Sequence, residues 1–158
     1  MAEALIALGS NIGAREEHLR YAVGRLGRLG SVRAVSSFHE TEPAGFASQD
    51  LFLNAALALE TELGPRELMR EMLRIEAERG RERRILNGPR TLDLDLLLYE
   101  DLVMDEPGLT LPHPRMHERL FVLAPLAEVA PEAVHPVLKR SVRGPLEEAQ
   151  GRESRLRR

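Results

Sequence analysis

The chain has 158 residues, of which 43% are hydrophobic, and this is enough for one domain with a proper core. Its net charge of −3 gives no indication of an extended basic surface, which argues against a protein that binds along the phosphate backbone of a nucleic acid. No cysteine is present, so disulfides and thiolate metal sites are excluded. The N-terminus lacks the basic start of a signal peptide, and no apolar run approaches the ~18 residues of a membrane span. We therefore expect a cytoplasmic protein.

Short strands and one helix are predicted in the first part of the chain. Residues 5–8 form an apolar run that ends at Gly9-Ser10-Asn11, which is typical of a buried strand and a turn. Apolar residues at helical spacing predict a helix over 15–29. Residues 31–39 are rich in β-branched side chains and predict a second strand. A third strand is expected at 51–61, although its run of Ala and Leu would fit a helix as well.

A second helix and a fourth strand follow. Pro65 stands at the first position of the helix, where a missing N–H costs nothing. The fourth strand is expected at 91–99, and a short extra strand around 102–103. Residues 115–130, with prolines at 112, 114, 125 and 131, predict one or two short helices.

This order of elements is β-α-β-β-α-β. It predicts an α+β fold of the ferredoxin-like kind, in which helices pack on an antiparallel sheet, with an extra short strand and C-terminal helices added. No internal repeat or linker interrupts the sequence, so we expect a single domain over residues 1–150. Residues 151–158, with four arginines among the last seven residues, are expected to be a frayed tail.

Two aspartates on the fourth strand are the most informative feature of the sequence. Side chains alternate along a strand, so Asp93 and Asp95 share one face while Leu92, Leu94 and Leu96 share the other. The two carboxylates then stand roughly 6.6 Å apart along the strand, at ~3.3 Å per residue. Like charges on one face repel unless a cation lies between them.

An arginine-rich segment precedes this strand. Residues 79–90 contain five arginines and one glutamate, with glycines at 80 and 88. A carboxylate pair beside such a cluster suits Mg²⁺ and a polyphosphate, because Mg²⁺ prefers hard oxygens and phosphates accept from guanidinium groups. A loop of this kind often closes over a ligand. The alternatives are a solvated sheet edge and a disordered, soluble loop.

Other candidate residues carry weaker signals. Phe52 and Asn54 share a strand face and could grip a flat heterocycle, although such a pair is commonplace. His113 and Arg119 could contact phosphate oxygens, or could be surface residues. Zinc is not expected, because no cysteine is present and the histidines lack a carboxylate at metal-site spacing. The glycines of segment 9–13 lack the spacing of a phosphate loop and predict a tight turn.

These features together resemble one family, the 6-hydroxymethyl-7,8-dihydropterin pyrophosphokinases. The resemblance covers nearly the whole chain and includes Gly-Pro-Arg-Thr-Leu-Asp-Leu-Asp, which is the family signature. The matching segments, in chain order, are residues 7–11, 35–38, 52–56, 88–95 and 111–114.

The resemblance implies that pyrophosphate is transferred from ATP to the hydroxymethyl group of the reduced pterin, with release of AMP, in folate biosynthesis. Two Mg²⁺ ions would bridge Asp93 and Asp95 to the triphosphate. Arg81 and Arg90 match arginines that stabilise charge on the transferred group. The positions that match the nucleotide side are Glu76, Arg83, Leu96, Thr110, His113 and Arg119. The positions that match the pterin side are Thr41, Pro43, Ala44, Phe52, Asn54 and Phe121, with the pterin ring between the two phenylalanines.

Three positions depart from the family pattern. Asn87 stands where members often carry an aromatic residue, Gly108 where some have an arginine, and Pro114 where some have a tyrosine. ATP binding is then expected to rely more on Arg90, His113 and Arg119. We expect a monomer that binds these two small molecules and neither nucleic acid nor membrane.

Two rival functions stay open. One is a ferredoxin-like ligand-binding module without catalysis. Such a module would have no need for a carboxylate pair, an arginine loop and an aromatic-amide pocket together, so their combination argues against it. The other is a Mg²⁺-dependent phosphotransferase with a different acceptor, against which the match at residues 41–54 argues. Release of AMP from ATP that depends on the added pterin would discriminate among all three.

Overall fold

The computed structural model describes residues 1–41, 51–80 and 91–156, with side chains described as far as residue 151. Along the chain the elements are β1 (Ala2–Ser10), α1 (Arg15–Leu26), β2 (Ser31–Val35), β3 (His39–Thr41), β4 (Phe52–Thr61), α2 (Pro65–Glu78), β5 (Asp93–Tyr99), β6 (Met104–Glu106), β7 (Leu109–Leu111), a 3-10 turn η1 (Met116–Glu118), α3 (Leu120–Val129), β8 (Val134–His135), β9 (Arg140–Ser141) and α4 (Arg143–Leu156).

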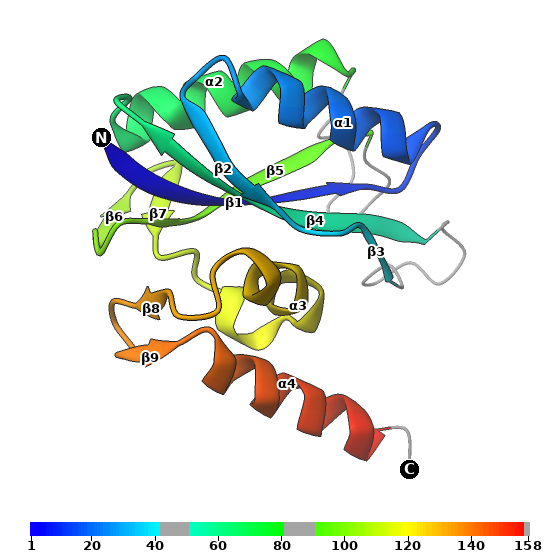
Figure 1. The fold of residues 1–158 in the computed structure, drawn as a ribbon, viewed down its shortest axis with the longest axis vertical. Coiled ribbons are helices and arrows are strands. Elements are labelled where there is room, and N and C mark those ends of the chain that lie inside the picture. Colours follow the sequence, from blue (N-terminus) through cyan, green and yellow to red (C-terminus); the bar gives the residue numbers. More distant parts are fainter. Residues whose placement is uncertain (42–50, 81–90, 157–158) are drawn as a thin grey trace.

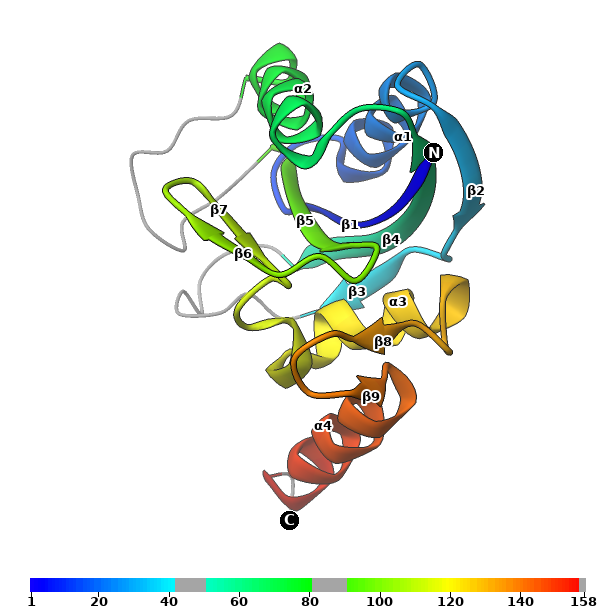
Figure 2. The ribbon, with the colours of Figure 1, turned by 90° about the vertical axis from the view of Figure 1, so that its left-hand side faces the viewer.

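The centre of the molecule is an antiparallel sheet. Strands β2, β4, β1 and β5 lie side by side in that order, and β3 also pairs with β4. Helices α1 and α2 cover one face of the sheet, whereas α3 lies on the other face with α4 beyond it (Figure 1). Figure 2 shows the same layers from the side. The α+β fold with a ferredoxin-like order of elements is therefore confirmed.

The ambiguous run in the third predicted strand is a strand. β4 lies between β1 and β2, and both of its faces are covered, so the run from Ala55 to Leu59 is buried throughout. A strand buried on both faces loses the apolar-polar alternation that would identify it. The sequence pattern therefore did not exclude a helix here, and this helical alternative was wrong.

Two other strand predictions differ from the structure in detail. The single strand expected over 31–39 is divided into β2 and β3, because the paired residues of β2 end at Val35 and pairing with β4 resumes only at His39. The extra strand expected at 102–103 starts two residues later, as β6, and forms a hairpin with β7. Gly108 turns this hairpin with a positive φ of 80°, which glycine adopts without strain.

The C-terminal part is helical. The region expected to hold short helices contains η1 and α3, as predicted. Helix α4 runs to Leu156 and thus through most of the segment for which a frayed tail was expected. None of the helices in the described part of the chain is long and apolar enough to cross a membrane.

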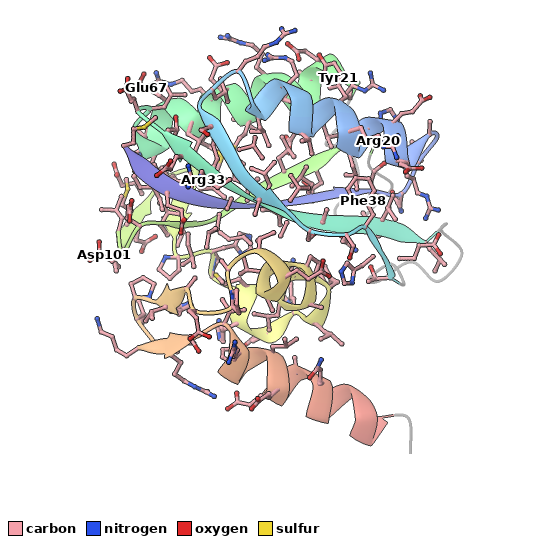
Figure 3. The ribbon with its side chains drawn as sticks, viewed as in Figure 1. Arg20, Tyr21, Arg33, Phe38, Glu67 and Asp101 are labelled. Carbon is pink, nitrogen blue, oxygen red and sulfur yellow. The ribbon has the colours of Figure 1, made fainter. Side chains whose placement is uncertain are left out.

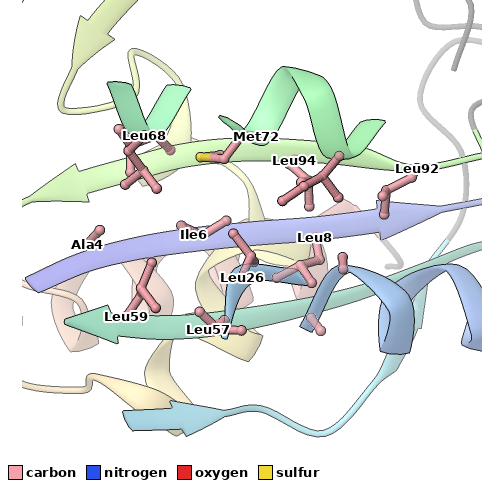
Figure 4. Packing of buried hydrophobic residues seen from close by; sticks show 14 of the residues in the cluster. Ala4, Ile6, Leu8, Leu26, Leu57, Leu59, Leu68, Met72, Leu92 and Leu94 are labelled. Atoms are coloured by element: carbon pink, nitrogen blue, oxygen red, sulfur yellow. The ribbon is translucent and has the colours of Figure 1, made fainter. Parts of the chain in front are cut away.

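Two apolar clusters hold the layers together. Ile6 and Leu8 of β1 pack with Leu26 of α1 and Met72 of α2, as Figure 4 shows. The alternate side of the sheet packs on α3, with Leu123 among its buried residues. Side chains fill both layers (Figure 3). Burial on both faces fixes which residues of each strand point to which helices, and this orientation positions the site.

Candidate active site

Strand register brings four residues into one row. Gly9 of β1 lies directly opposite Asn54 of β4 on one side and opposite Asp93 of β5 on the other. Asn54 in turn lies opposite His39 of β3. Because directly opposed residues of neighbouring strands point to the same face, these four residues follow one line across four strands.

Asp95 lies in the next row of the same face. It is opposite Ala7, which is opposite Ala56. Ala7 and Ala56 pack in the cluster with α3, whereas Leu94 of the neighbouring row packs under α1 and α2. Both aspartates therefore point to the α3 side of the sheet, as the alternation predicted. We call this surface the carboxylate face, and define it by Gly9, Phe52, Asn54, Asp93 and Asp95.

His113 and Arg119 stand beside the two carboxylates. The His113 backbone N–H donates to the Leu97 carbonyl oxygen at 2.8 Å, which holds the segment after β7 against β5. The Nε2 atom of His113 then lies 3.9 Å from an Asp95 carboxylate oxygen. Burial, together with the positive charges of Arg119 and Arg115, lowers the pKa of His113, although Asp93 acts in the opposite direction.

The tautomer of His113 follows from its neighbours. Its Nδ1 atom accepts a hydrogen bond from the Arg115 backbone N–H at 3.3 Å. In the neutral ring the proton then resides on Nε2, the nitrogen that faces Asp95. Arg119 adds a guanidinium that lies 5.5 Å from the centroid of the Phe121 ring and whose pKa is lowered by burial. The site therefore combines a carboxylate pair with an N–H donor and a cation.

The predicted aromatic-amide pocket lies at the other end of the carboxylate face. Thr41 and Phe52 are directly opposite each other, and the Asn54 Nδ2 atom donates to the Thr41 hydroxyl at 2.5 Å. Asn54 is 7% exposed, so its amide is held in place. Phe121 is in the first turn of α3, against the same side of the sheet. Thr41, Phe52 and Asn54 are therefore adjacent, and Phe121 lies on the helix that covers this side of the sheet.

Three residues expected on the nucleotide side make contacts within the protein. Leu96 is 2% exposed and its side chain packs in the cluster under α1 and α2. Glu76 of α2 is 3% exposed, and one of its carboxylate oxygens accepts from the Leu94 backbone N–H at 2.7 Å. It therefore anchors β5 between the two aspartates. Thr110 is exposed on β7, where its hydroxyl donates weakly to Asp105 at 3.5 Å.

Five other predicted residues lie outside the described part of the chain. They are Pro43, Ala44, Arg81, Arg83 and Arg90. The same holds for Asn87, one of the positions that depart from the family pattern.

The donor set is compatible with a hard divalent cation such as Mg²⁺. Among the described residues, no group of three or more His, Asp and Glu side chains comes together as a metal cage. Mg²⁺ needs no such cage, because it is commonly bound by one or two carboxylates, with water and substrate phosphates as its other ligands. The pair Asp93 and Asp95 on one strand face meets this requirement.

A separate cavity of about 550 Å³ lies at the start of α1. Its lining includes Phe38 and Leu53, which belong to the cluster under α1 and α2, so the cavity is on the opposite side of β4 from the carboxylate face. Arg15, the basic residue that lines it, already donates to Glu40 and to the Leu51 carbonyl oxygen. We therefore do not place the chemistry there.

Sequence reasoning missed two features of the site. Gly9 and Ala7 form a floor of small residues between the carboxylates and β4, a role that the alternation with Ile6 and Leu8 could have revealed. Arg115 contributes positive charge to both His113 and Arg119 and was not considered as a site residue.

An α+β sheet whose one face carries paired carboxylates, a histidine N–H and an arginine has the groups that a phosphotransferase uses to bind a metal and a polyphosphate. The sequence model of the "7,8-dihydro-6-hydroxymethylpterin-pyrophosphokinase (HPPK)" family matches residues 5–131. A pyrophosphokinase of this kind from Bacillus subtilis (strain 168) is 52% identical over 128 residues, which cover 80% of this chain and 77% of that protein. Its counterpart from Haemophilus influenzae is 44% identical over 138 residues, 86% of each chain. The chain belongs to the HPPK family.

Solved structures show the same fold. The wild-type HPPK-DHPS of Plasmodium falciparum superposes with a TM-score of 0.77 at 13% identity, over 98% of this chain and 46% of that chain. This chain thus spans less than half the length of that two-part protein. As a family member, it is a diphosphokinase of folate synthesis that transfers a pyrophosphoryl group to hydroxymethyldihydropterin and uses ATP.

Proposed function

We propose that pyrophosphoryl transfer takes place across the carboxylate face, with ATP at the β5 end and the pterin at the β3–β4 end. The observation that carries this proposal is the row formed by Asn54, Gly9 and Asp93. In this row the amide of Asn54, which would bind the pterin, and the carboxylate of Asp93, which would bind the metal, lie on one face with only Gly9 between them. An acceptor and a donor bound to this row would meet over Gly9.

On the nucleotide side, Asp93 and Asp95 would hold Mg²⁺ together with oxygens of the triphosphate. The bound ions would neutralise phosphate charge and polarise the β-phosphoryl group. His113, with its proton on Nε2, would donate to a phosphate oxygen, and Arg119 would pair with the same charged group. We retain Arg81 and Arg90 as the residues that stabilise the transferred group.

The remaining nucleotide positions also stay in the proposal. They are Glu76, Arg83, Leu96 and Thr110. Because the Leu96 side chain is in the core, a nucleotide would meet its backbone.

On the pterin side, Phe52 and Phe121 would stack on the two faces of the ring. One N–H of the Asn54 amide is donated to Thr41, so its carbonyl oxygen would accept from a ring N–H and its second N–H would donate to a ring acceptor. Pro43 and Ala44 complete this side as expected from the resemblance. Orientation by these residues would align the pterin hydroxymethyl group with the phosphoryl centre.

The experiment is a measurement of AMP formation from ATP with and without added hydroxymethyl-dihydropterin. We expect AMP only when pterin is present, and we expect Asp93→Asn and Asp95→Asn to lower its rate by about a thousandfold, equivalent to about 4 kcal/mol. Asp101→Asn removes an exposed carboxylate just beyond β5 (Figure 3) and serves as the matched control, with an unchanged rate. A folded Asp95→Asn enzyme with near-normal turnover would refute the metal role.

We further propose a cytoplasmic monomer with one catalytic domain over residues 1–150. Light scattering of the purified protein at assay concentration tests the monomer, and a dimer mass would contradict it.

A further inference from the structure

Glu128, in the last turn of α3, binds a segment that is far away in the sequence. Its Oε1 atom accepts from the Ser37 backbone N–H at 2.8 Å and from the Ser37 hydroxyl at 2.9 Å. Its Oε2 atom contacts the Nε2 atom of His39. Burial by itself would raise the pKa of Glu128, but the hydrogen bonds from Ser37 and His39 outweigh it and lower that pKa. Both carboxylate oxygens are therefore used in one cluster, which we call the Glu128 cluster (Ser37, His39 and Glu128).

The Glu128 cluster is not a hydrolase triad, although it contains a serine, a histidine and a carboxylate. In such a triad the serine and the acid bind opposite nitrogens of the imidazole, so that one activates the other. Here Ser37 and Glu128 both approach Nε2 of His39. The arrangement cannot pass a proton from the hydroxyl through the ring, and it acts as a clamp between two elements.

One of these elements is β3, which carries a wall of the pterin side. In the described part of the chain β3 has only three residues and pairs with one strand, β4, so side-chain contacts such as this clamp and the Arg15–Glu40 ion pair are needed to anchor it. His39 at its start is directly opposite Asn54, and Thr41 at its end accepts from the Asn54 amide. A short edge strand of this kind opens easily unless its ends are anchored.

The other element is α3, which carries the opposite wall. Phe121 and Glu128 are seven residues apart, so they lie on the same face of the helix, two turns from each other. The face that presents Phe121 to the sheet thus also presents Glu128 to β3. A shift of β3 relative to α3 would change the gap into which a flat ring must fit.

We infer that Glu128 is a positioning residue for the pterin, which sets Thr41 and Asn54 relative to Phe121 by clamping β3 to α3. This inference rests on the proposed function, because it assumes that the pterin binds between these walls. It assigns to Glu128 no contact with either substrate.

The test compares Glu128→Ala and Glu128→Gln with the wild-type enzyme. Glutamine keeps one acceptor oxygen for Ser37 but loses the charge that His39 contacts, so an intermediate effect is expected. We expect the KM for hydroxymethyl-dihydropterin to rise about tenfold in Glu128→Ala and about threefold in Glu128→Gln, with kcat and the KM for ATP within about twofold of wild type. Glu132→Gln removes an exposed ion pair with Arg143 next to the same helix and is the matched control, with no change in either KM.

The outcomes separate the inference from the proposed function. If wild-type AMP formation does not depend on pterin, the proposed function fails. The inference also fails if AMP formation depends on pterin but Glu128→Ala has the wild-type pterin KM. It fails too if Glu128→Ala raises the KM for pterin and the KM for ATP by the same factor, because the clamp is then only structural. Should Glu128→Ala not fold, Glu128→Gln and Ser37→Ala take its place, and a selective rise in the pterin KM is still required of them.

Discussion

A single methyl group at Gly9 would intrude on the pterin side of the site while leaving the fold intact. A Cβ atom at this position would lie 3.1 Å from the Asn54 Oδ1 atom, 3.8 Å from a Phe52 ring carbon and 3.9 Å from the Leu53 carbonyl oxygen. Only the first distance is shorter than an ordinary contact, and it requires Asn54 to move by a few tenths of an ångström. The three nearest atoms all belong to β4, so the carboxylate of Asp93 is spared.

The cost in stability is expected to be small because two terms oppose each other. Replacing glycine by alanine restricts the unfolded chain and stabilises a protein by about 0.4–1 kcal/mol where the backbone allows it. Overpacking of a filled site costs about 1–3 kcal/mol. The net destabilisation of Gly9→Ala is then about 1–2 kcal/mol, which a folded domain can tolerate.

The functional effect is expected to be selective. Asn54 is held by Thr41, so a forced movement of its amide displaces the acceptor oxygen that would read the pterin. We expect the pterin KM to rise about tenfold, or about 1.4 kcal/mol, and the ATP KM to stay unchanged. Initial rates of AMP formation, with each substrate varied while the other is saturating, give both constants, and thermal unfolding gives the stability.

Two other glycines provide matched controls. Gly24 is exposed in the middle of α1 with no atom within 4 Å of an added Cβ, so Gly24→Ala should stabilise the protein by about 0.5–1 kcal/mol and leave activity unchanged. An added Cβ at Gly30 would lie 2.0 Å from the Glu60 carbonyl oxygen, so Gly30→Ala should fail to fold. A Gly9→Ala enzyme with an unchanged pterin KM, or one as unstable as Gly30→Ala, would refute the reasoning.

Three further predictions address stacking and pH. Phe52→Ala should weaken pterin binding by about 1–3 kcal/mol, by analogy with stacking on nucleobases, and leave ATP binding unchanged in calorimetry. An equal loss of affinity for pterin and for ATP would show that Phe52 is only a core residue. Hydrogen bonds from Arg25 lower the pKa of Glu78 from 4.5 to about 2, so the stability that this residue contributes is present above pH 4.5 and is lost as the pH falls towards 2. Glu78→Gln should therefore lower the melting temperature at pH 7 but not at pH 2, and an equal loss at both values would contradict this. Burial lowers the pKa of His135, whose Nδ1 atom accepts from two backbone N–H groups. As the pH drops below 6.5, His135 of the unfolded chain is protonated before His135 of the folded protein, so the stability should fall. His135→Asn keeps an acceptor oxygen and should flatten the melting temperature between pH 7 and pH 5, whereas an unchanged slope would exclude His135 as the source.

Glu76 shows that the position of a residue in a family pattern does not reveal its contacts in the structure. The sequence allowed only the inference that it falls on a nucleotide-lining position. In the structure its buried carboxylate accepts from the Leu94 backbone N–H, between the two aspartates of β5. The sequence pattern could not reveal this contact, because burial of a helix residue depends on which strand the helix covers.

The sequence by itself determined the order of the elements and the chemistry of the carboxylate face. The alternation of Asp93 and Asp95 with leucines is a local property, since a strand places every second side chain on the same face whatever lies around it. Helical spacing and Pro65 likewise marked α1 and α2 from local preferences. The identity of β4 could not be read in this way, because burial on both faces removes the period of two.

Only the tertiary structure decided which distant residues share the site. Strand register set Gly9 between Asn54 and Asp93, and packing of α3 on the sheet brought Glu128 to His39, 89 residues away in the sequence. No local pattern encodes such a pair. Its formation depends on the free energy of burying whole elements against one another, which fixes register and helix position together.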